Sequence, residues 1–208
     1  MYPELTIEVF LDKLASSAPE PGGGAAAALV GAAGAALVSM VANLTVGREK
    51  FASAQAEMER ARAQADALRA ALLAAIDRDA EAFRGVMAAY KMPRETDEHK
   101  TARRRATQDA LRAASRIPAE VIALCEDVAT WSRVAAEQGN PQVISDAAVA
   151  ALLADAAAQS AALNVRINLA GISDSAFTGP LWADVQTRLD RIRTQRDGVV
   201  RMTYERIG

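Results

Sequence analysis

Three consecutive glycines open a long uncharged segment of this 208-residue chain. Gly22, Gly23 and Gly24 follow Pro19-Glu20-Pro21 and lead into an alanine-rich stretch. Glycines at the start of a helix leave backbone N–H groups accessible beside the positive end of the helix dipole. Such groups suit an anion or a carbonyl oxygen, although a plain turn has the same composition. We therefore take these three glycines as candidate binding residues.

Two carboxylates in the sequence could move protons. Asp79 lies four residues from Ala75 and from Phe83, on or near the apolar stripe of a predicted helix. Burial there would raise its pKa toward the range that is useful for proton transfer. Asp77 is a more exposed alternative on the same helix. Asp146, near the start of another predicted helix, is the second candidate, although a carboxylate at that place also complements a helix dipole.

Three asparagines stand in apolar surroundings, where an unpaired amide costs about 1–3 kcal/mol. Asn43 comes near the end of the uncharged segment. Asn164 and Asn168 are four residues apart and therefore share one helix face. Asp146 precedes Asn164 by 18 residues, or five helical turns, which places it on the same face at the other end of the helix. We expect these amides to orient a polar substrate.

Residues for several other chemistries are missing. His99 is the only histidine and lies in a charged stretch, and Cys125 is the only cysteine, on an apolar helix face. Nucleophilic Ser-His-Asp or Cys-His pairs are therefore not supported, and a zinc site lacks its ligands. A phosphate-binding P-loop needs Gly-Lys-Ser/Thr, whereas alanines follow Gly24. We expect no metal site.

Composition restricts the fold class. Alanine accounts for 49 of the 208 residues and aromatic residues for only 4%, so a β-sandwich or barrel is not expected. Hydrophobic residues make up 51% of the chain and the net charge is only -2, which excludes a disordered chain. Alanine is the best helix former and the smallest residue with a Cβ. The sequence predicts an all-α protein whose helix backbones approach closely.

Hydrophobic periodicity divides the chain into about seven helices, one of them very long. We expect a single domain over residues 1–208, folded as an elongated antiparallel bundle. Pro118 and Pro180 should each open a helix. The first half of the long helix is expected to project as an arm. Turn residues and capping residues set the boundaries of the predicted helices, which span about 6–16, 24–46, 49–90, 95–115, 118–138, 143–170 and 180 onwards.

Charge and hydropathy limit the partners. Lysine plus arginine number 24 against 26 aspartates plus glutamates, so nothing favours nucleic-acid binding. The uncharged stretch 24–44 has the length of a membrane span, but alanine and glycine insert weakly, and no second span is expected. A helix buried on all sides is the better interpretation. One cysteine and the lack of a signal peptide predict a cytoplasmic protein without membrane or nucleic-acid partners.

Short motifs spread over most of the chain resemble those of the cyclodeaminase/cyclohydrolase family. This family includes the C-terminal domain of formiminotransferase-cyclodeaminase and stand-alone methenyltetrahydrofolate cyclohydrolases. The resemblance fades after about residue 171, so we expect no functional residue in the last helix. The segments that carry it are Phe10-Leu11-Asp12-Lys13-Leu14-Ala15-Ser16, Pro19-x-Pro-Gly-Gly-Gly24, Gly31-x-x-Gly34-Ala35-Ala36-Leu37, Met40-Val41-Ala42-Asn43-Leu44-Thr45-x-Gly47, Asp79-Ala80-x-Ala82-Phe83, Tyr90-Lys91-Met92-Pro93, Asn140-x-x-x-x-Ser145-Asp146-Ala147-Ala148 and Ala162-Leu163-Asn164-Val165-x-Ile167-Asn168-Leu169.

The resemblance implies an all-α homodimer with a folate cleft and no cofactor beyond the tetrahydrofolate substrate. In the cyclohydrolase reaction, water adds to the carbon that bridges N5 and N10 of methenyltetrahydrofolate, and opening at N5 gives 10-formyltetrahydrofolate. In the cyclodeaminase reaction, N10 attacks the formimino carbon of 5-formiminotetrahydrofolate and ammonia leaves. We favour the cyclohydrolase. The cyclodeaminase and a noncatalytic helical dimer that retains the fold stay open as alternatives.

Each candidate residue has a role in this chemistry. Asp79 or Asp146 would shuttle protons, and the three asparagines would orient the pterin or the water. The backbone N–H groups of the glycine turn would hydrogen-bond to a carbonyl oxygen or to a developing oxyanion. Arg48 and Lys91 would bind the carboxylates of the glutamate tail.

Overall fold

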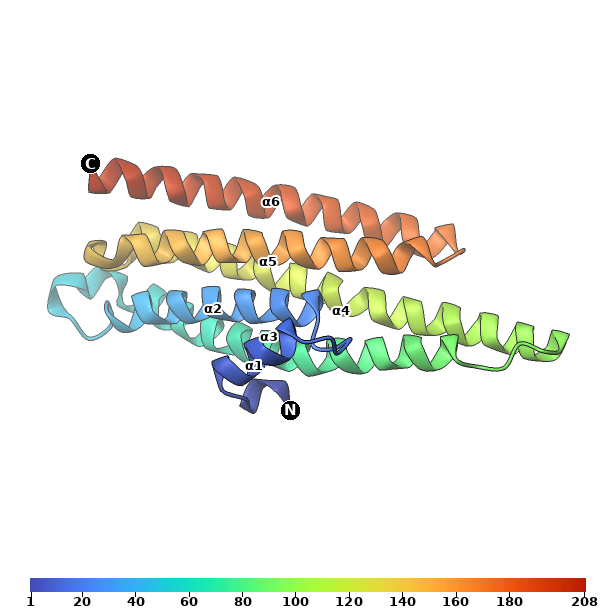
Figure 1. The fold of residues 1–208 in the computed structure, drawn as a ribbon. Coiled ribbons are helices and arrows are strands. Elements are labelled where there is room, and N and C mark those ends of the chain that lie inside the picture. The colour runs from blue at the N-terminus through green and yellow to red at the C-terminus, as the bar shows by residue number, and fades with distance from the viewer.

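Four long helices form the body of the protein, which a computed structural model describes over residues 1–208 (Figure 1). They are α2 (Gly23–Asn43), α3 (Gln55–Tyr90), α4 (Asp97–Gln138) and α5 (Ile144–Ala170). Both α2 and α4 pack on α3 and on α5, so the four helices surround one core. No strand is present, and the all-α prediction is confirmed.

Small residues let these helices approach closely. A Cβ added to Gly34 would lie 3.1 Å from the carbonyl oxygen of Ala150, so α2 and α5 nearly touch there. A Cβ on Gly31 would lie 3.1 Å from Cys125 Sγ and 3.3 Å from Leu72. Burial raises the pKa of Cys125 to about 12, which makes this thiol an inert part of the core. The alanine and glycine content therefore reports close backbone packing.

Two helices lie outside the four-helix body. α6 (Ser175–Ile207) packs along α4 and α5 (Figure 1), and α1 (Ile7–Ala15) follows the N-terminal segment Tyr2–Glu4, which contacts α3. Thr6 caps α1 by accepting a hydrogen bond from the Val9 amide at 3.3 Å. Of α1, only Phe10 is buried, and Ile7 is 75% exposed. Short 3-10 helices complete the fold at Tyr2–Glu4, Glu49–Ala54 and Pro141–Val143.

The prediction that Pro118 begins a helix is wrong. The predicted helices 95–115 and 118–138 are the single helix α4, which leaves six α-helices in place of about seven. Proline cannot donate to the carbonyl oxygen of Ala114, but Asn168 Nδ2 on α5 donates to that oxygen at 3.0 Å. A side chain from another helix thus satisfies the freed carbonyl, and α4 continues through the proline.

Two further boundaries differ from the predictions. Asp174 caps α6 by accepting a hydrogen bond from the Ala176 amide at 3.0 Å, so Pro180 lies inside the helix and does not begin it. Only one hydrogen bond is lost, near an exposed helix end. α2 ends at Asn43, three residues before the predicted boundary, and Gly47, with φ +77, turns the chain after it.

The projecting arm lies at the opposite end of α3 from the predicted one. Met58, Ala61 and Ala65, in the first half of α3, are fully buried in the core. The beginning of α4 extends beyond the other helices instead, together with the loop that joins it to α3 (Figure 1). Arg103 holds this end together, because its Nε and Nη2 donate to the carbonyl oxygen of Tyr90 at 3.2 and 3.1 Å.

Two helices are long and apolar enough to span a membrane, judged by length and composition alone. They are Gly23–Asn43 and, against the expectation of a single such segment, Pro141–Ala170. In the folded protein, 61% of the first apolar window and 50% of the second are buried. Core helices of a bundle have the same character, so these two helices are weak evidence for a membrane.

Candidate functional site

The first turn of α2 lies against the carboxyl group of Asp79 on α3. At Gly24 no side chain fits, because an added Cβ would lie 2.6 Å from Asp79 Cγ. The Ala25 amide hydrogen-bonds to the same carboxyl group. Gly22 caps α2 without any side-chain hydrogen bond, so other first-turn amides lack a capping partner. The close approach of the carboxyl group, rather than a special φ, therefore requires glycine at position 24.

Burial raises the pKa of Asp79 above its ordinary value, in the direction predicted from its place on the helix. The hydrogen bond from the backbone offsets part of this effect. The two nearest arginines along α3 bind other carboxylates: Arg78 pairs with Glu120 at 2.7 Å, and Arg84 pairs with Glu20 at 2.6 Å. A half-buried carboxyl group with a raised pKa and no paired cation can accept a proton and attract a cationic substrate.

Asn164 of α5 lies on the other side of the same turn. A Cβ added to Gly23 would lie 3.7 Å from Asn164 Nδ2, which is ordinary contact distance. That Nδ2 donates to the carbonyl oxygen of Ser160 at 3.0 Å, while the side-chain oxygen of Asn164 accepts no hydrogen bond. Three helices therefore bring together what we call the Asp79 cluster, namely Gly22, Gly23, Gly24, Asp79 and Asn164.

Asn168 lies one turn beyond Asn164 and contacts a different neighbour. Its Nδ2 makes the hydrogen bond to the Ala114 carbonyl that allows α4 to pass through Pro118. Its side chain is half-buried between α4 and α5. The geometry gives Asn168 a structural partner, and its predicted role in orienting the pterin stays a prediction.

Asn43 and Asp146 lie at the opposite end of the bundle from Asp79. Nineteen residues of α2 separate Gly24 from Asn43, or ~28 Å along a helix. Eighteen residues of α5 separate Asp146 from Asn164, or ~27 Å. Asp146 is half-buried in the first turn of α5, where it complements the helix dipole. Within this chain, these residues do not meet the Asp79 cluster.

Side chains around Asn43 bind one another. Ser39 Oγ donates to Asp66 at 3.0 Å, and Arg69 pairs with Asp66 at 3.2 Å. Arg62 donates to Asn43 Oδ1 at 3.5 Å. We call these five residues the Asn43 cluster, and most of them line a shallow hollow of about 540 Å³.

The two basic residues predicted for the glutamate tail are both exposed and distant from Asp79. Arg48 follows α2, beyond the Asn43 cluster. Lys91 caps the end of α3, twelve residues or ~18 Å beyond Asp79. Asp77, the alternative carboxylate, accepts a hydrogen bond from the Tyr2 amide at 2.8 Å and so holds the N-terminus on α3.

Thr45 and Asn140 fasten the end of α2 to the start of α5, a role that sequence reasoning missed. Thr45 is fully buried, donates to the Val41 carbonyl at 2.7 Å and accepts from the Asn140 amide at 2.8 Å. Asn140 Nδ2 donates in turn to the Leu44 carbonyl at 3.4 Å. The two residues are 95 positions apart, so nothing in the local sequence signals their contact.

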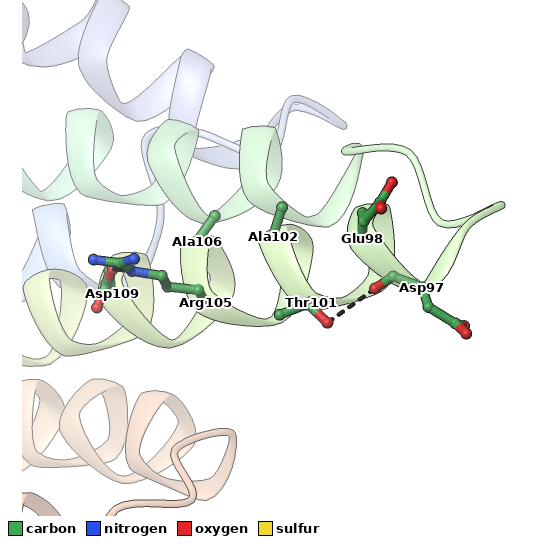
Figure 2. A pocket seen from close by; sticks show the side chains of 7 residues that line it. All are labelled: Asp97, Glu98, Thr101, Ala102, Arg105, Ala106 and Asp109. Atoms are coloured by element: carbon green, nitrogen blue, oxygen red, sulfur yellow. Dashed lines mark hydrogen bonds and ion pairs between the residues drawn. The ribbon is translucent and has the colours of Figure 1, made fainter.

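Another hollow on the surface lies far from these groups. Its volume is about 770 Å³, and every residue that lines it belongs to α4 between Asp97 and Asp109 (Figure 2). Figure 2 shows an open helix surface near the tip of the arm, where the Thr101 hydroxyl donates to the Asp97 carbonyl at 2.9 Å. A hollow on one exposed helix brings no groups from different elements together, and no cluster of three metal-binding side chains is present in the chain.

Comparison with known proteins identifies the family of the chain. Residues 6–187 match the family model described as formiminotransferase-cyclodeaminase, which is 182 of the 208 residues. The chain belongs to this family. The formiminotransferase-cyclodeaminase match extends beyond residue 171, where the motifs fade, and takes in the first part of α6 with Trp182.

Individual proteins that resemble this chain are named either as cyclohydrolases or as cyclodeaminases. A methenyltetrahydrofolate cyclohydrolase of Methylorubrum extorquens is 50% identical over 172 residues, which cover 83% of each chain. The formimidoyltransferase-cyclodeaminase of Sus scrofa is 36% identical over 91% of this chain, but the chain spans only 35% of that protein. The crystal structure of formiminotetrahydrofolate cyclodeaminase from Thermotoga maritima has a TM-score of 0.91 and 32% identity, with both chains fully covered.

Proposed function

We propose that the protein hydrolyses 5,10-methenyltetrahydrofolate to 10-formyltetrahydrofolate, with Asp79 as the proton shuttle. The observation that carries this proposal is the half-buried Asp79 carboxyl group, which has a raised pKa and faces the glycine turn of α2 and Asn164. The relative that is 50% identical over 83% of both chains supports the same reaction.

Asp79 has the chemistry that each step requires. The ionised carboxylate attracts the cationic methenyl group and takes a proton from water as the water oxygen bonds to the carbon bridging N5 and N10. The protonated carboxyl then returns a proton to N5 as the bond between that carbon and N5 breaks. The hydroxyl of the adduct loses its proton to solvent and becomes the formyl oxygen on N10. One water is consumed and one proton is released, and the reaction needs no cofactor beyond the folate.

The other members of the Asp79 cluster serve the oxygen and the pterin. The first-turn amides at Gly23 and Gly24 lie at the positive end of α2, where they stabilise negative charge developing on the adduct oxygen. The side-chain oxygen of Asn164, which accepts no hydrogen bond within the protein, is available to an N–H group of the pterin.

A second candidate reaction is ammonia release from 5-formiminotetrahydrofolate, because the Thermotoga maritima neighbour that covers the whole chain is named for it. The decisive experiment supplies the purified protein with each folate separately. We expect loss of methenyltetrahydrofolate absorbance and no ammonia from the formimino compound. Ammonia release with unchanged methenyl absorbance would reverse the assignment, and turnover of neither folate would favour a noncatalytic helical dimer.

We also propose that the protein works as a homodimer. Apolar side chains are exposed along one side of α2 and α5, among them Met40, Val149 and Leu152. A row of this kind exceeds the scattered apolar residues of an ordinary monomer surface. A two-fold axis across the middle of α2 would cover it, and would set the Asn43 cluster of one protomer beside the Asp79 cluster of its partner.

Mixing of two inactive variants tests this shared site. Asp79→Asn disables one half of the site and Asn43→Ala the other, so a heterodimer of the two would keep one intact site. Equal mixing, with subunits allowed to exchange, should restore about a quarter of wild-type activity. No recovery in a mixture shown to contain heterodimers would place each site within one protomer. A cytoplasmic location without nucleic-acid or membrane partners stays part of the proposal, resting on charge and cysteine use.

A further inference from the structure

A groove lies between the end of α5 and the beginning of α6, beside the Asp79 cluster. Its volume is about 490 Å³, within the range of small-molecule sites. Leu163 and Ile167 form an exposed apolar floor, at 73% and 72% exposure. The guanidinium of Arg166 lies over the ring of Trp182, 5.0 Å from its centroid. Thr178 and Gly179 of α6 complete the rim.

Arg166 is a positive charge without a partner. Other carboxylates of the same two helices bind other arginines: Asp155 of α5 pairs with Arg196 at 3.3 Å, and Asp184 of α6 pairs with Arg188 at 2.9 Å. No carboxylate lies within ion-pair distance of Arg166, and its contact with the Trp182 ring is the interaction that orients it. A guanidinium fixed over a ring and free of acidic partners is well suited to bind an external carboxylate.

The side chains of α5 connect this cation to the Asp79 cluster. At 3.6 residues per turn, Ile167, Leu163 and Arg166 lie about 60°, 100° and 160° from Asn164 around the helix, all in the same direction. The order across the exposed side of α5 is therefore amide, apolar, apolar, cation. A folate has the same order of chemistry: a polar pterin, an aminobenzoyl ring and an anionic glutamate. A helix with its side chains is ~10–12 Å across, which an extended aminobenzoylglutamate can span.

We propose that this groove binds the aminobenzoylglutamate end of the folate, with the ring over Leu163 and Ile167 and a glutamate carboxylate on Arg166. The inference rests on the proposed function, because it takes the pterin to lie at the Asp79 cluster. It gives the tail role to Arg166, which follows Asn164 by two residues, in place of the more distant Arg48 and Lys91. Specificity for the folate tail thereby depends on α6.

Substrates with and without the tail test the groove by kinetics. Arg166→Gln should raise KM for methenyltetrahydrofolate about tenfold with kcat unchanged, because a charged hydrogen bond is lost in ground state and transition state alike. The same variant should leave KM unchanged for methenyltetrahydropteroate, which lacks glutamate. Arg116→Gln is the matched control. The Arg116 guanidinium lies 5.8 Å from the ring of Phe177, which is also on α6, but Arg116 does not line the groove. Equal KM values for wild type and Arg166→Gln would overturn the proposal.

A binding measurement separates failure of the groove from failure of the proposed function. In a Trp131→Phe background, Trp182 is the only tryptophan, and p-aminobenzoylglutamate should change its fluorescence while p-aminobenzoate changes it far less. Arg166→Gln should abolish the difference between the two compounds. If neither methenyl nor formimino folate is turned over but this difference persists, the proposed function fails and the groove stands. If the two compounds change the Trp182 fluorescence equally, or if Arg166→Gln changes only the sedimentation of the protein, the groove does not hold the tail. A second copy of the chain then covers the groove.

Discussion

The two ends of the antiparallel pair α2 and α5 differ in how their polar groups are satisfied. At the Asn43 end, Thr45 both donates and accepts within the protein, and Asn140 does the same. At the Asp79 end, the carboxyl group is desolvated without a paired cation, and the side-chain oxygen of Asn164 has no donor. Polar groups that saturate one another stabilise a fold, whereas groups left partly unsatisfied are available to a ligand.

Removing the charge at the Asp79 end should have the largest effect. Asp79→Asn preserves the shape and an acceptor for the Ala25 amide, but it cannot accept a proton. We expect kcat to fall by about 10²–10⁴-fold, the usual contribution of general acid–base catalysis. Loss of methenyltetrahydrofolate absorbance is the measurement. A variant that keeps wild-type kcat would move the proton transfer elsewhere, with Asp146→Asn as the next variant to measure.

The same substitution should stabilise the protein. The folded protein holds the Asp79 proton to a higher pH than the unfolded chain does, because the folded pKa is raised. Stability is therefore lost as the pH rises through the interval between the two pKa values, and it stays lost at neutral pH. Asparagine avoids this loss, so Tm of Asp79→Asn should exceed that of wild type at pH 7. The two values should converge below about pH 3, where the aspartate is protonated in both states. An equal Tm at pH 7 would contradict the desolvation of Asp79.

Alanine substitutions at neighbouring glycines of the Asp79 end should have different effects on stability and on kcat. In Gly24→Ala, the added methyl would have to displace the carboxyl group, with about 1–3 kcal/mol lost in unfolding free energy and about 10²-fold lost in kcat. Gly23→Ala should be tolerated, since its Cβ would reach only ordinary contact distance. Gly85→Ala, on the same helix as Asp79 and with nothing within 4 Å of its Cβ, should stabilise by about 0.5–1 kcal/mol. Urea unfolding measures the free energy of unfolding, and initial rates measure kcat. Similar results for positions 23 and 24 would argue against the close approach of Gly24 to the Asp79 carboxyl group.

At the Asn43 end, a polar deletion should affect stability more than turnover. Thr45→Val keeps the volume but leaves the buried Asn140 amide unpaired, which costs about 1–3 kcal/mol. Thr187→Val removes a hydroxyl that is exposed on α6 and should cost much less. Chemical denaturation measures both changes. A loss of kcat larger than the loss of folded protein would show that Thr45 does more than fasten α2 to α5.

The smallest expected effect concerns Asn168, whose amide supports α4, whereas that of Asn164 does not. Asn168→Ala should destabilise the protein while Pro118 is present, and by about 1 kcal/mol less in a Pro118→Ala background, where residue 118 can itself donate to the Ala114 carbonyl. A double-mutant cycle in urea measures this coupling. If the two substitutions are additive, the amide of Asn168 does not support α4, and its predicted role at the substrate gains weight.

Local patterns predicted helices and burial well, and missed what depends on distant partners. Asp79 and the glycine turn were found because a carboxylate on an apolar stripe and a run of glycines are local signals. Pro118 was misread because the donor that replaces its N–H comes from a residue 50 positions later. Helical periodicity placed Asp146 on the face of Asn164 and at the other end of the same helix, and α5 does hold them at opposite ends. Arg166 gave no signal, since its significance depends on Trp182, in a helix expected to carry no functional residue.

Because α4 runs unbroken for 42 residues, it passes both ends of the α2 and α5 pair as a single rod of ~63 Å. Neither the Asp79 end nor the Asn43 end of this pair can therefore unfold while the other end keeps its native contacts on α4. In native-state hydrogen exchange, amides beside Thr45 and amides beside Asp79 should open together, as one cooperative unit. Only the arm and the outer end of α6, which lack contacts on several sides, should exchange by smaller openings. The protein would then lose the Asp79 cluster and the contact between Thr45 and Asn140 in the same event.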